Sequence, residues 1–401
     1  MSKLFGGSLL IAGTCIGGGM LGLPIATAKS GVLGSSVLFI ICWMLMTFTA
    51  LLTLEVNLCF PKESNMISMA KATLGKSGEI ICWTVYLFFL YALVSAYIAG
   101  GQDVLHGLLA LIGIDAPIAV CAFIFVGVFG AIVMAGVKHV DLFNRLLMMI
   151  KLLTIFVLIF FIVQQIDLNN YITSKPIYVL SAVTVAVTSF GFSIIVPSLR
   201  NYFDDNIKQL RLAIVIGSIL PLLCYIMWNT AIFGSVPLQG DFGLERLQTL
   251  DQPITGLLAS LQHFVPQQTI IMLARGFTSI CVLTAFACVS LGLADYLADG
   301  FKVKAESKAR WGVMLATFIP PIGVVLFYPQ AFIMLLGIAG LLCLILQALM
   351  PVLMAWRCRY VNKIEGSYQV FGGKPLLILA SLTSLIMIFI ASYQMIYREF
   401  I

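Results

Sequence analysis

Long apolar runs separated by short polar segments dominate the chain. A helix needs about 20 consecutive apolar residues to cross the hydrocarbon core of a bilayer, and most of these runs reach or exceed that length. We therefore predict about eleven transmembrane helices. Their expected ranges are 4–28, 33–58, 79–105, 117–137, 142–164, 178–200, 208–234, 267–298, 309–328, 331–356 and 374–397.

The longest connection between these spans, residues 235–266, mixes charged residues with the apolar segment LLASLQHF. This mixture predicts one or two short helices lying on the bundle. The other connections are short, so residues 1–401 are expected to form a single transmembrane domain without a soluble domain. That organisation argues against receptors, ATP-driven pumps and two-domain enzymes. The sequence also contains no glycine-rich loop of the kind that binds ATP phosphates.

The composition agrees with a membrane protein. Hydrophobic residues make up 61% of the chain and charged residues only 10%, whereas roughly a quarter of a typical soluble domain is charged. The ten cysteines lie almost entirely in apolar runs without a metal or disulfide spacing, and the three histidines fall near span ends. We expect no metal and no cofactor. A signal peptide is the alternative reading of the first thirty residues, but their apolar stretch is too long for one.

Lysine and arginine concentrate in alternate connections, and such residues favour the cytoplasmic side. With a cytoplasmic N-terminus, the inner side holds Lys3 and the basic residues of segments 62–76, 138–145, 200–211, 302–310 and 357–374. The outer side then holds only Lys29, Lys175, Arg246 and Arg398. We therefore expect the C-terminus on the opposite, periplasmic face. The net charge of +6 reflects this topology rather than a nucleic-acid partner.

Two predicted spans contain helix-breaking segments, GTCIGGGMLGLP at 13–24 and SFGFSIIVPSLR at 189–200. When they are aligned without gaps, Gly18 pairs with Gly191 and Pro24 with Pro197. Three consecutive glycines cost a helix about 1 kcal/mol each relative to alanine, and freed backbone groups in a membrane must line a cavity or bind something. Interrupted helices at corresponding positions of two halves indicate a transporter binding site.

Glycines also serve as close-packing contacts between membrane helices. We interpret Gly6, Gly7, Gly100 and Gly101 as packing contacts of this kind. Three consecutive glycines at 17–19 exceed what such a packing stripe needs. We therefore expect an unwound site there and a second one around Ser189 to Ser193.

Lys151 is the only charge near the middle of its span, with nine residues of 142–163 before it and twelve after it. A cation at that depth indicates function, and an ammonium that binds and releases a proton is suited to proton coupling. The alternative is a structural lysine bound to a helix end. For Glu55, Asp103, Asp295 and Asp299 we expect structural, helix-terminal or gating roles. Arg275 is a candidate partner of Asp103 in an external gate.

Four segments together resemble the bacterial aromatic amino-acid permeases. They are the two helix-breaking segments at 13–24 and 189–200, LYALVSAYIAGG at 90–101 and LGLADYLADGF at 291–301. These permeases are the tyrosine- and tryptophan-specific members of the hydroxy/aromatic amino-acid permease family, in the amino acid-polyamine-organocation superfamily. The resemblance covers nearly the whole chain. It implies an all-α, leucine-transporter-type fold with two inverted five-helix repeats (4–164 and 178–356), broken helices 1 and 6, and an extra helix at 374–397. It also implies proton-coupled import of aromatic amino acids through the inner membrane of a Gram-negative bacterium by alternating access.

The resemblance further implies substrate-binding residues on both breaks and on neighbouring spans. They are Thr14, Gly17, Gly18, Gly19, Phe190, Gly191, Phe192, Tyr91, Ser95 and Thr284. The N–H groups of Gly17 to Gly19 would bind the substrate carboxylate, and carbonyls around Phe190 and the first break would accept from its ammonium. Phe190 and Phe192 would flank the aromatic ring.

The same resemblance assigns proton coupling to Lys151, which stands where sodium-coupled relatives bind sodium. Its expected acceptors are carbonyls near Ala12 and Gly13 and the hydroxyl of Ser290. The segment Ser193-Ile194-Ile195 departs from some family members, where a more polar stretch is expected. This departure leaves the choice among aromatic substrates open, and tyrosine is favoured on resemblance alone.

Three alternatives remain at this stage. A sodium-coupled or exchange-type neutral amino-acid transporter of the same fold is the nearest one, although an ammonium at Lys151 would fill the cation site. A channel would require polar stripes along several helices. A membrane enzyme would require acid–base pairs or metal motifs that the sequence lacks. The expected partners are therefore an aromatic amino acid, a proton and lipid, with the oligomeric state open.

Overall fold

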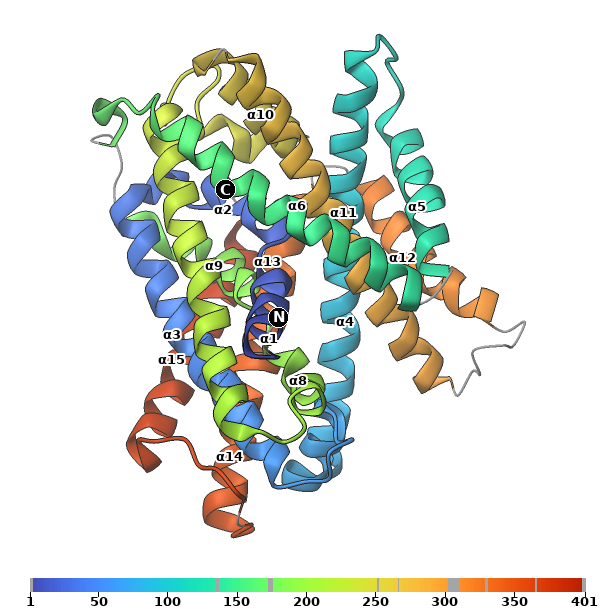
Figure 1. Ribbon diagram of the computed structural model, residues 1–401, viewed down its shortest axis with the longest axis vertical. Helices are drawn as coiled ribbons and strands as arrows, with labels where there is room; N and C mark the ends of the chain where they lie inside the picture. The colour runs from blue at the N-terminus through green and yellow to red at the C-terminus, as the bar shows by residue number, and fades with distance from the viewer. Residues whose placement is uncertain are drawn as a thin grey trace.

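The computed structural model describes residues 3–398 except 135–136, 172–175, 251, 266, 302–309, 329–330 and 365. Within these ranges every regular element is helical and no strand occurs. Figure 1 shows the helices gathered into one bundle, with α5 and α12 together along one side. The predicted all-helical class is therefore confirmed.

Fifteen α-helices are described, with several short 3₁₀ and π turns between them. Their bounds are α1 Lys3–Cys15, α2 Gly18–Ala26, α3 Gly31–Leu58, α4 Met66–Leu111, α5 Ile118–Met134, α6 Val137–Val163, α7 Val183–Ser189, α8 Val196–Tyr202, α9 Ile207–Ser235, α10 Pro253–Phe264, α11 Gln268–Gly300, α12 Arg310–Phe327, α13 Phe332–Cys343, α14 Met350–Trp356 and α15 Gly373–Arg398.

Each of the eleven predicted ranges contains helix. In the described part of the chain, eight helices are long and apolar enough to cross a membrane, and the bent pair of α1 and α2 makes a ninth. The helices α5 and α12 are shorter apolar segments. The count of eleven crossings therefore stays a prediction.

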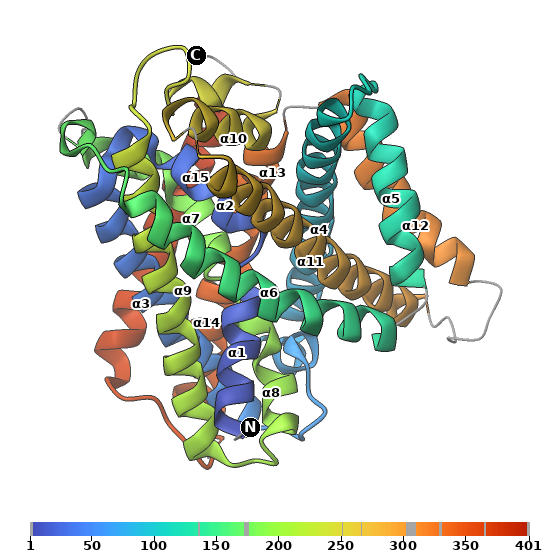
Figure 2. The same cartoon turned by 45° about the horizontal axis from the view of Figure 1, so that its top comes forward.

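Helices α2 and α7 lie inside the bundle, whereas α1 keeps an exposed side that includes Phe5 and Leu10. The α1 helix packs against α9, α2 packs against α7, and α7 packs against α13. The long helices α4 and α11 pack against each other, and α11 also packs against α6 (Figure 2). On the outside, large apolar side chains such as Phe123, Phe160 and Phe389 are exposed, as expected of a surface that faces lipid.

Glycines outside the breaks allow close contact between helices, as predicted. An added Cβ at Gly7 would lie 2.4 Å from the Phe203 ring, and one at Gly101 would lie 2.3 Å from the Phe125 ring. Gly6 and Gly100 meet side chains of Tyr202 and Phe332 in the same way. These four positions are packing contacts.

The connection between α9 and α11 contains a 3₁₀ turn at Arg246–Thr249 and the helix α10, in agreement with the predicted short helices. The Asp103 carboxylate accepts from the N–H of Ile254 at 2.9 Å and from that of Thr255 at 3.3 Å, and so caps α10. Arg275 donates to Gln262 at 3.1 Å. The expected Asp103–Arg275 gate is therefore wrong for this structure, because the start of α10 takes the carboxylate.

Glu55 forms a buried ion pair with Arg359, with an N–O distance of 2.5 Å. The guanidinium contacts both carboxylate oxygens, and the Val370 N–H donates to one of them at 2.7 Å. The pair joins the end of α3 to the π turn Arg357–Val361 and the segment before α15. This arrangement agrees with the structural role expected for Glu55.

Candidate functional site

The first break separates α1 from α2, which meet at an angle of 51°. Helix α1 ends at Cys15, Gly17 adopts an extended conformation, and α2 starts at Gly18. The first N–H groups of a helix have no partners within it, and they carry a partial positive charge. The start of α2 therefore offers an anion-binding end inside the bundle.

Close approach of two other segments requires glycine in this break. An added Cβ at Gly18 would lie 2.5 Å from the Tyr97 ring on α4. One at Gly19 would lie 2.9 Å from the Ser189 hydroxyl, at the end of α7. Gly17 has more room, since its nearest neighbour is the Ala285 side chain at 3.5 Å. The glycine run thus both opens the helix and brings the two breaks together.

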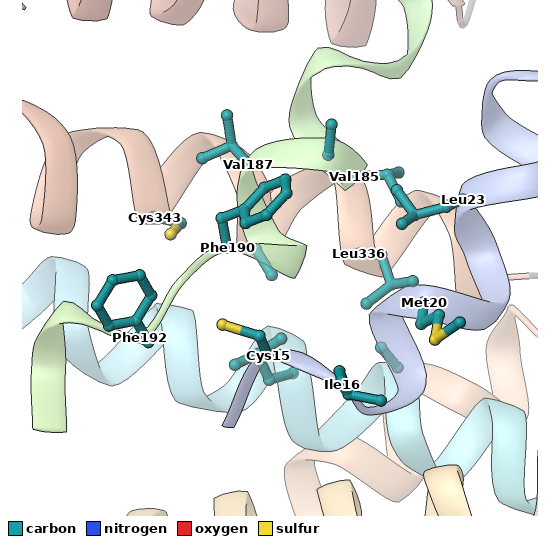
Figure 3. Close-up of a cluster of buried hydrophobic side chains, with 14 of the residues drawn as sticks. Cys15, Ile16, Met20, Leu23, Val185, Val187, Phe190, Phe192, Leu336 and Cys343 are labelled. Carbon is teal, nitrogen blue, oxygen red and sulfur yellow. The ribbon is translucent and has the colours of Figure 1, made fainter. Parts of the chain in front are cut away.

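The second break separates α7 from α8. Helix α7 ends at Ser189, residues 190–192 are not helical, and a 3₁₀ turn at Ser193–Ile195 leads into α8. The side chains of Phe190 and Phe192 are fully buried. Figure 3 shows both rings beside Cys343 of α13, with Cys15 and Ile16 of the first break nearby. The two breaks therefore share one apolar environment.

Tyr225 on α9 connects the two breaks. Its hydroxyl oxygen lies 2.7 Å from the carbonyl oxygen of Cys15 and 2.8 Å from that of Ser189. These carbonyls end α1 and α7, where helices leave acceptors unpaired. Sequence reasoning missed this residue, because a tyrosine in an apolar span carries no sign of partners so distant along the chain.

Tyr225→Phe should loosen the contact between the breaks. The carbonyls of Cys15 and Ser189 would lose the one hydroxyl proton that they share, at a cost of about 1–3 kcal/mol. We expect a lower unfolding temperature in detergent and weaker substrate binding. Tyr91→Phe is the matched control, since its hydroxyl donates to the Ala316 carbonyl on α12 at 2.8 Å. Equal melting and binding of the two variants would contradict a bridging role.

Lys151 on α6 reaches the first break. Its side chain is 1% exposed, and its Nζ donates to the Ile16 carbonyl oxygen. The Nζ also lies 3.4 Å from the Thr284 hydroxyl on α11. That hydroxyl donates to the Ile280 carbonyl at 2.8 Å, which leaves its lone pairs for the ammonium. Lys151 thus links α6, the first break and α11 through neutral oxygens.

The acceptors of Lys151 in the structure, Ile16 and Thr284, differ from the expected ones. The Ala12 carbonyl accepts from the Ile16 N–H at 2.8 Å, and Gly13 packs against Met148. Ser290 is fully buried, and its hydroxyl has no hydrogen-bond partner within the described ranges. Because α1 ends at Cys15, the free carbonyl near the lysine is that of Ile16.

Comparison with known proteins decides the family. Residues 1–392 match the model of the tryptophan/tyrosine permease family. The chain belongs to this family. It is 34% identical over 383 residues to the tyrosine-specific transport system 1 of Haemophilus influenzae, covering 94% of both chains. It is also 33% identical over 394 residues to that organism's tyrosine-specific transport system 2, covering 97% of this chain and 96% of the relative. It is 33% identical over 384 residues to the same organism's tryptophan-specific transport protein, covering 92% of this chain and 91% of the relative.

The permease is therefore a membrane transporter rather than an enzyme. The break residues 17–19 and 189–192 lie together in it, with Lys151 and Thr284 beside the first break. Thr14, Tyr91 and Ser95 use their hydroxyls elsewhere. Thr14 is exposed and bonds to the Leu10 carbonyl, Ser95 bonds to the Tyr91 carbonyl, and Tyr91 points to α12.

Gln347 is a second residue that sequence reasoning missed in this permease. It is fully buried in the π turn Leu344–Leu349 between α13 and α14. Its side-chain oxygen accepts from the N–H and from the hydroxyl of Ser193, each at 3.0 Å. It thereby caps the start of the helical segment after the second break.

Proposed function

We propose that the protein is a proton-coupled symporter that imports aromatic amino acids, with tyrosine favoured, across the bacterial inner membrane. In this proposal residues 1–401 form one domain of two inverted repeats, 4–164 and 178–356, with an extra helix at 374–397. The N-terminus is cytoplasmic and the C-terminus periplasmic, in keeping with the lysine and arginine distribution. The single observation that carries the proposal is the Lys151 hydrogen bond to the first of two facing helix breaks.

The substrate's charged groups have complementary partners at the breaks. The N–H groups of Gly17, Gly18 and Gly19 would bind the carboxylate at the start of α2. The carbonyl oxygens of Cys15 and Ser189 each have a second lone pair, and these would accept from the substrate ammonium beside the Tyr225 hydroxyl. The rings of Phe190 and Phe192 would pack against the aromatic side chain.

The burial of the breaks supports transport by alternating access. Phe190, Phe192 and Ile16 are fully buried, so a substrate reaches the breaks only when helices around them move. The charged Lys151 holds α6 and α11 to the first break. A hydrogen bond from an ionised donor is about twice as strong as a neutral one, so loss of the proton would weaken this link. We propose that this weakening favours opening toward the cytoplasm.

The specificity test is competition for uptake. In proteoliposomes containing the purified protein, unlabelled tyrosine, tryptophan and phenylalanine should each inhibit labelled tyrosine uptake at least about fivefold more strongly than leucine or serine, since the two stacked aromatic contacts add about 0.5–1.5 kcal/mol each. Replacement of sodium by potassium or choline at fixed pH should not change uptake. Equal inhibition by leucine would reject an aromatic site, and sodium dependence would favour the sodium-coupled alternative.

A further inference from the structure

The π turn Leu344–Leu349 gives Gln347 an unusual position. Single π turns within α-helices occur frequently at functional sites, and this one places a buried amide against the second break. The amide oxygen accepts from the Ser193 N–H, which can only donate. This bond fixes the orientation of the amide, with its oxygen toward Ser193 and its nitrogen, Nε2, on the other side.

Within the described part of the chain, Nε2 of Gln347 is buried and has no hydrogen-bond partner. A buried donor without an acceptor costs about 1–3 kcal/mol. Rotating the amide would not remove this cost, because it would set the nitrogen against the Ser193 N–H. The amide therefore retains an unused donor inside the protein.

The unused donor lies beside Gly191. An added Cβ at Gly191 would be 3.3 Å from Nε2 of Gln347 and 3.1 Å from the sulfur of Cys343. Gly191 is partly exposed, although Phe190 and Phe192 on either side of it are fully buried. Glycine thus lets the backbone of the second break approach the donor closely, at a point between the two rings that would pack against an aromatic substrate.

We propose that Gln347 binds the substrate and determines its specificity, with Nε2 donating a hydrogen bond to the phenolic oxygen of tyrosine. The proposal rests on the function proposed above and adds the residue that selects the substrate. A phenol oxygen accepts a hydrogen bond, an indole N–H only donates, and the phenylalanine ring does neither. Phenylalanine would leave Nε2 unpaired, and tryptophan would set two donors against each other.

Competition binding with the purified full-length protein in lipid nanodiscs tests this assignment. Labelled tyrosine is displaced by unlabelled tyrosine, phenylalanine or tryptophan. The wild type should bind tyrosine about 10- to 100-fold more tightly than phenylalanine, the range expected for one unpaired buried donor. Gln347→Met keeps the side-chain length without the donor, and should reduce this preference to less than about threefold.

Gln102→Met is the matched control, because Gln102 on α4 is also a buried glutamine whose Nε2 has no partner in the described ranges. It should keep the wild-type preference for tyrosine. Loss of preference in both variants, or in neither, would overturn the assignment. Gln347→Glu provides a second variant that replaces the donor with an oxygen while keeping an acceptor for Ser193, and it should shift the preference toward tryptophan.

The wild-type measurements separate the two levels of the proposal. Equal affinity of the wild type for tyrosine and phenylalanine would overturn the role of Gln347 and leave aromatic amino-acid transport intact. Failure to bind any of the three aromatic amino acids would overturn the proposed function and this assignment together.

Discussion

Lys151→Ala should abolish the accumulation of tyrosine driven by a pH gradient. The substitution removes the ammonium that holds the Ile16 carbonyl and contacts Thr284, while the N–H groups at the start of α2 remain. Uptake against a gradient should therefore fall to the level of protein-free liposomes, while some binding or exchange of tyrosine survives. Accumulation in proteoliposomes and exchange at equal pH are the two measurements.

Two further variants define what this result means. Lys151→Arg keeps the charge, but a guanidinium does not release its proton at any usable pH, so this variant should also fail to concentrate tyrosine. Lys71→Ala removes an exposed lysine paired with Glu79 on α4 and should transport normally. Concentrative uptake by the alanine variant at position 151 would show that Lys151 is not the coupling residue, and Glu55 or Asp295 would become the better candidate.

Gly18→Val should eliminate substrate binding. Its side chain would push against the Tyr97 ring, which lies 2.5 Å from the position of an added Cβ, and would crowd the start of α2. We expect no stabilisation of the variant by tyrosine in a thermal unfolding assay. Gly127→Val is the control, because no atom lies within 4 Å of a Cβ added there, and it should retain the wild-type shift.

A double variant separates the two reasons for glycine at position 18. Tyr97→Ala removes the ring that the valine would meet. If Gly18→Val combined with Tyr97→Ala still fails to bind tyrosine, the glycine serves the approach of the carboxylate. Recovery of binding in the double variant would instead show that glycine is needed for packing against α4.

Much of the architecture could be predicted from sequence because lipid imposes simple rules. About 20 apolar residues are needed for each crossing, so the ranges of the helices follow from hydropathy. The first break could be predicted because three adjacent glycines oppose a helix. Lys151 could be found because a charge near the middle of an apolar span is conspicuous.

The partners of the site residues could not be predicted in the same way. The acceptor for Lys151 depends on the residue at which α1 ends, and because the helix continues to Cys15 the free carbonyl is that of Ile16 rather than one near Gly13. Tyr225 and Gln347 bind backbone groups far away in the chain. Their roles depend on tertiary packing, which hydropathy does not encode.

Asp103 illustrates the same limit. It was a reasonable partner for Arg275 by charge alone. The carboxylate instead accepts from the first N–H groups of α10, because a helix start attracts a negative charge and offers unpaired donors. Only the path of the connection after α9 decides between the two partners.

Tyrosine accumulation under an imposed pH gradient tests the central claim most directly. Proteoliposomes containing the purified protein, free of sodium, are diluted into buffer that is more acidic outside than inside. Labelled tyrosine should accumulate above its external concentration, and a protonophore should abolish that accumulation. Uptake that only equilibrates, with or without the pH gradient, would contradict proton-coupled transport.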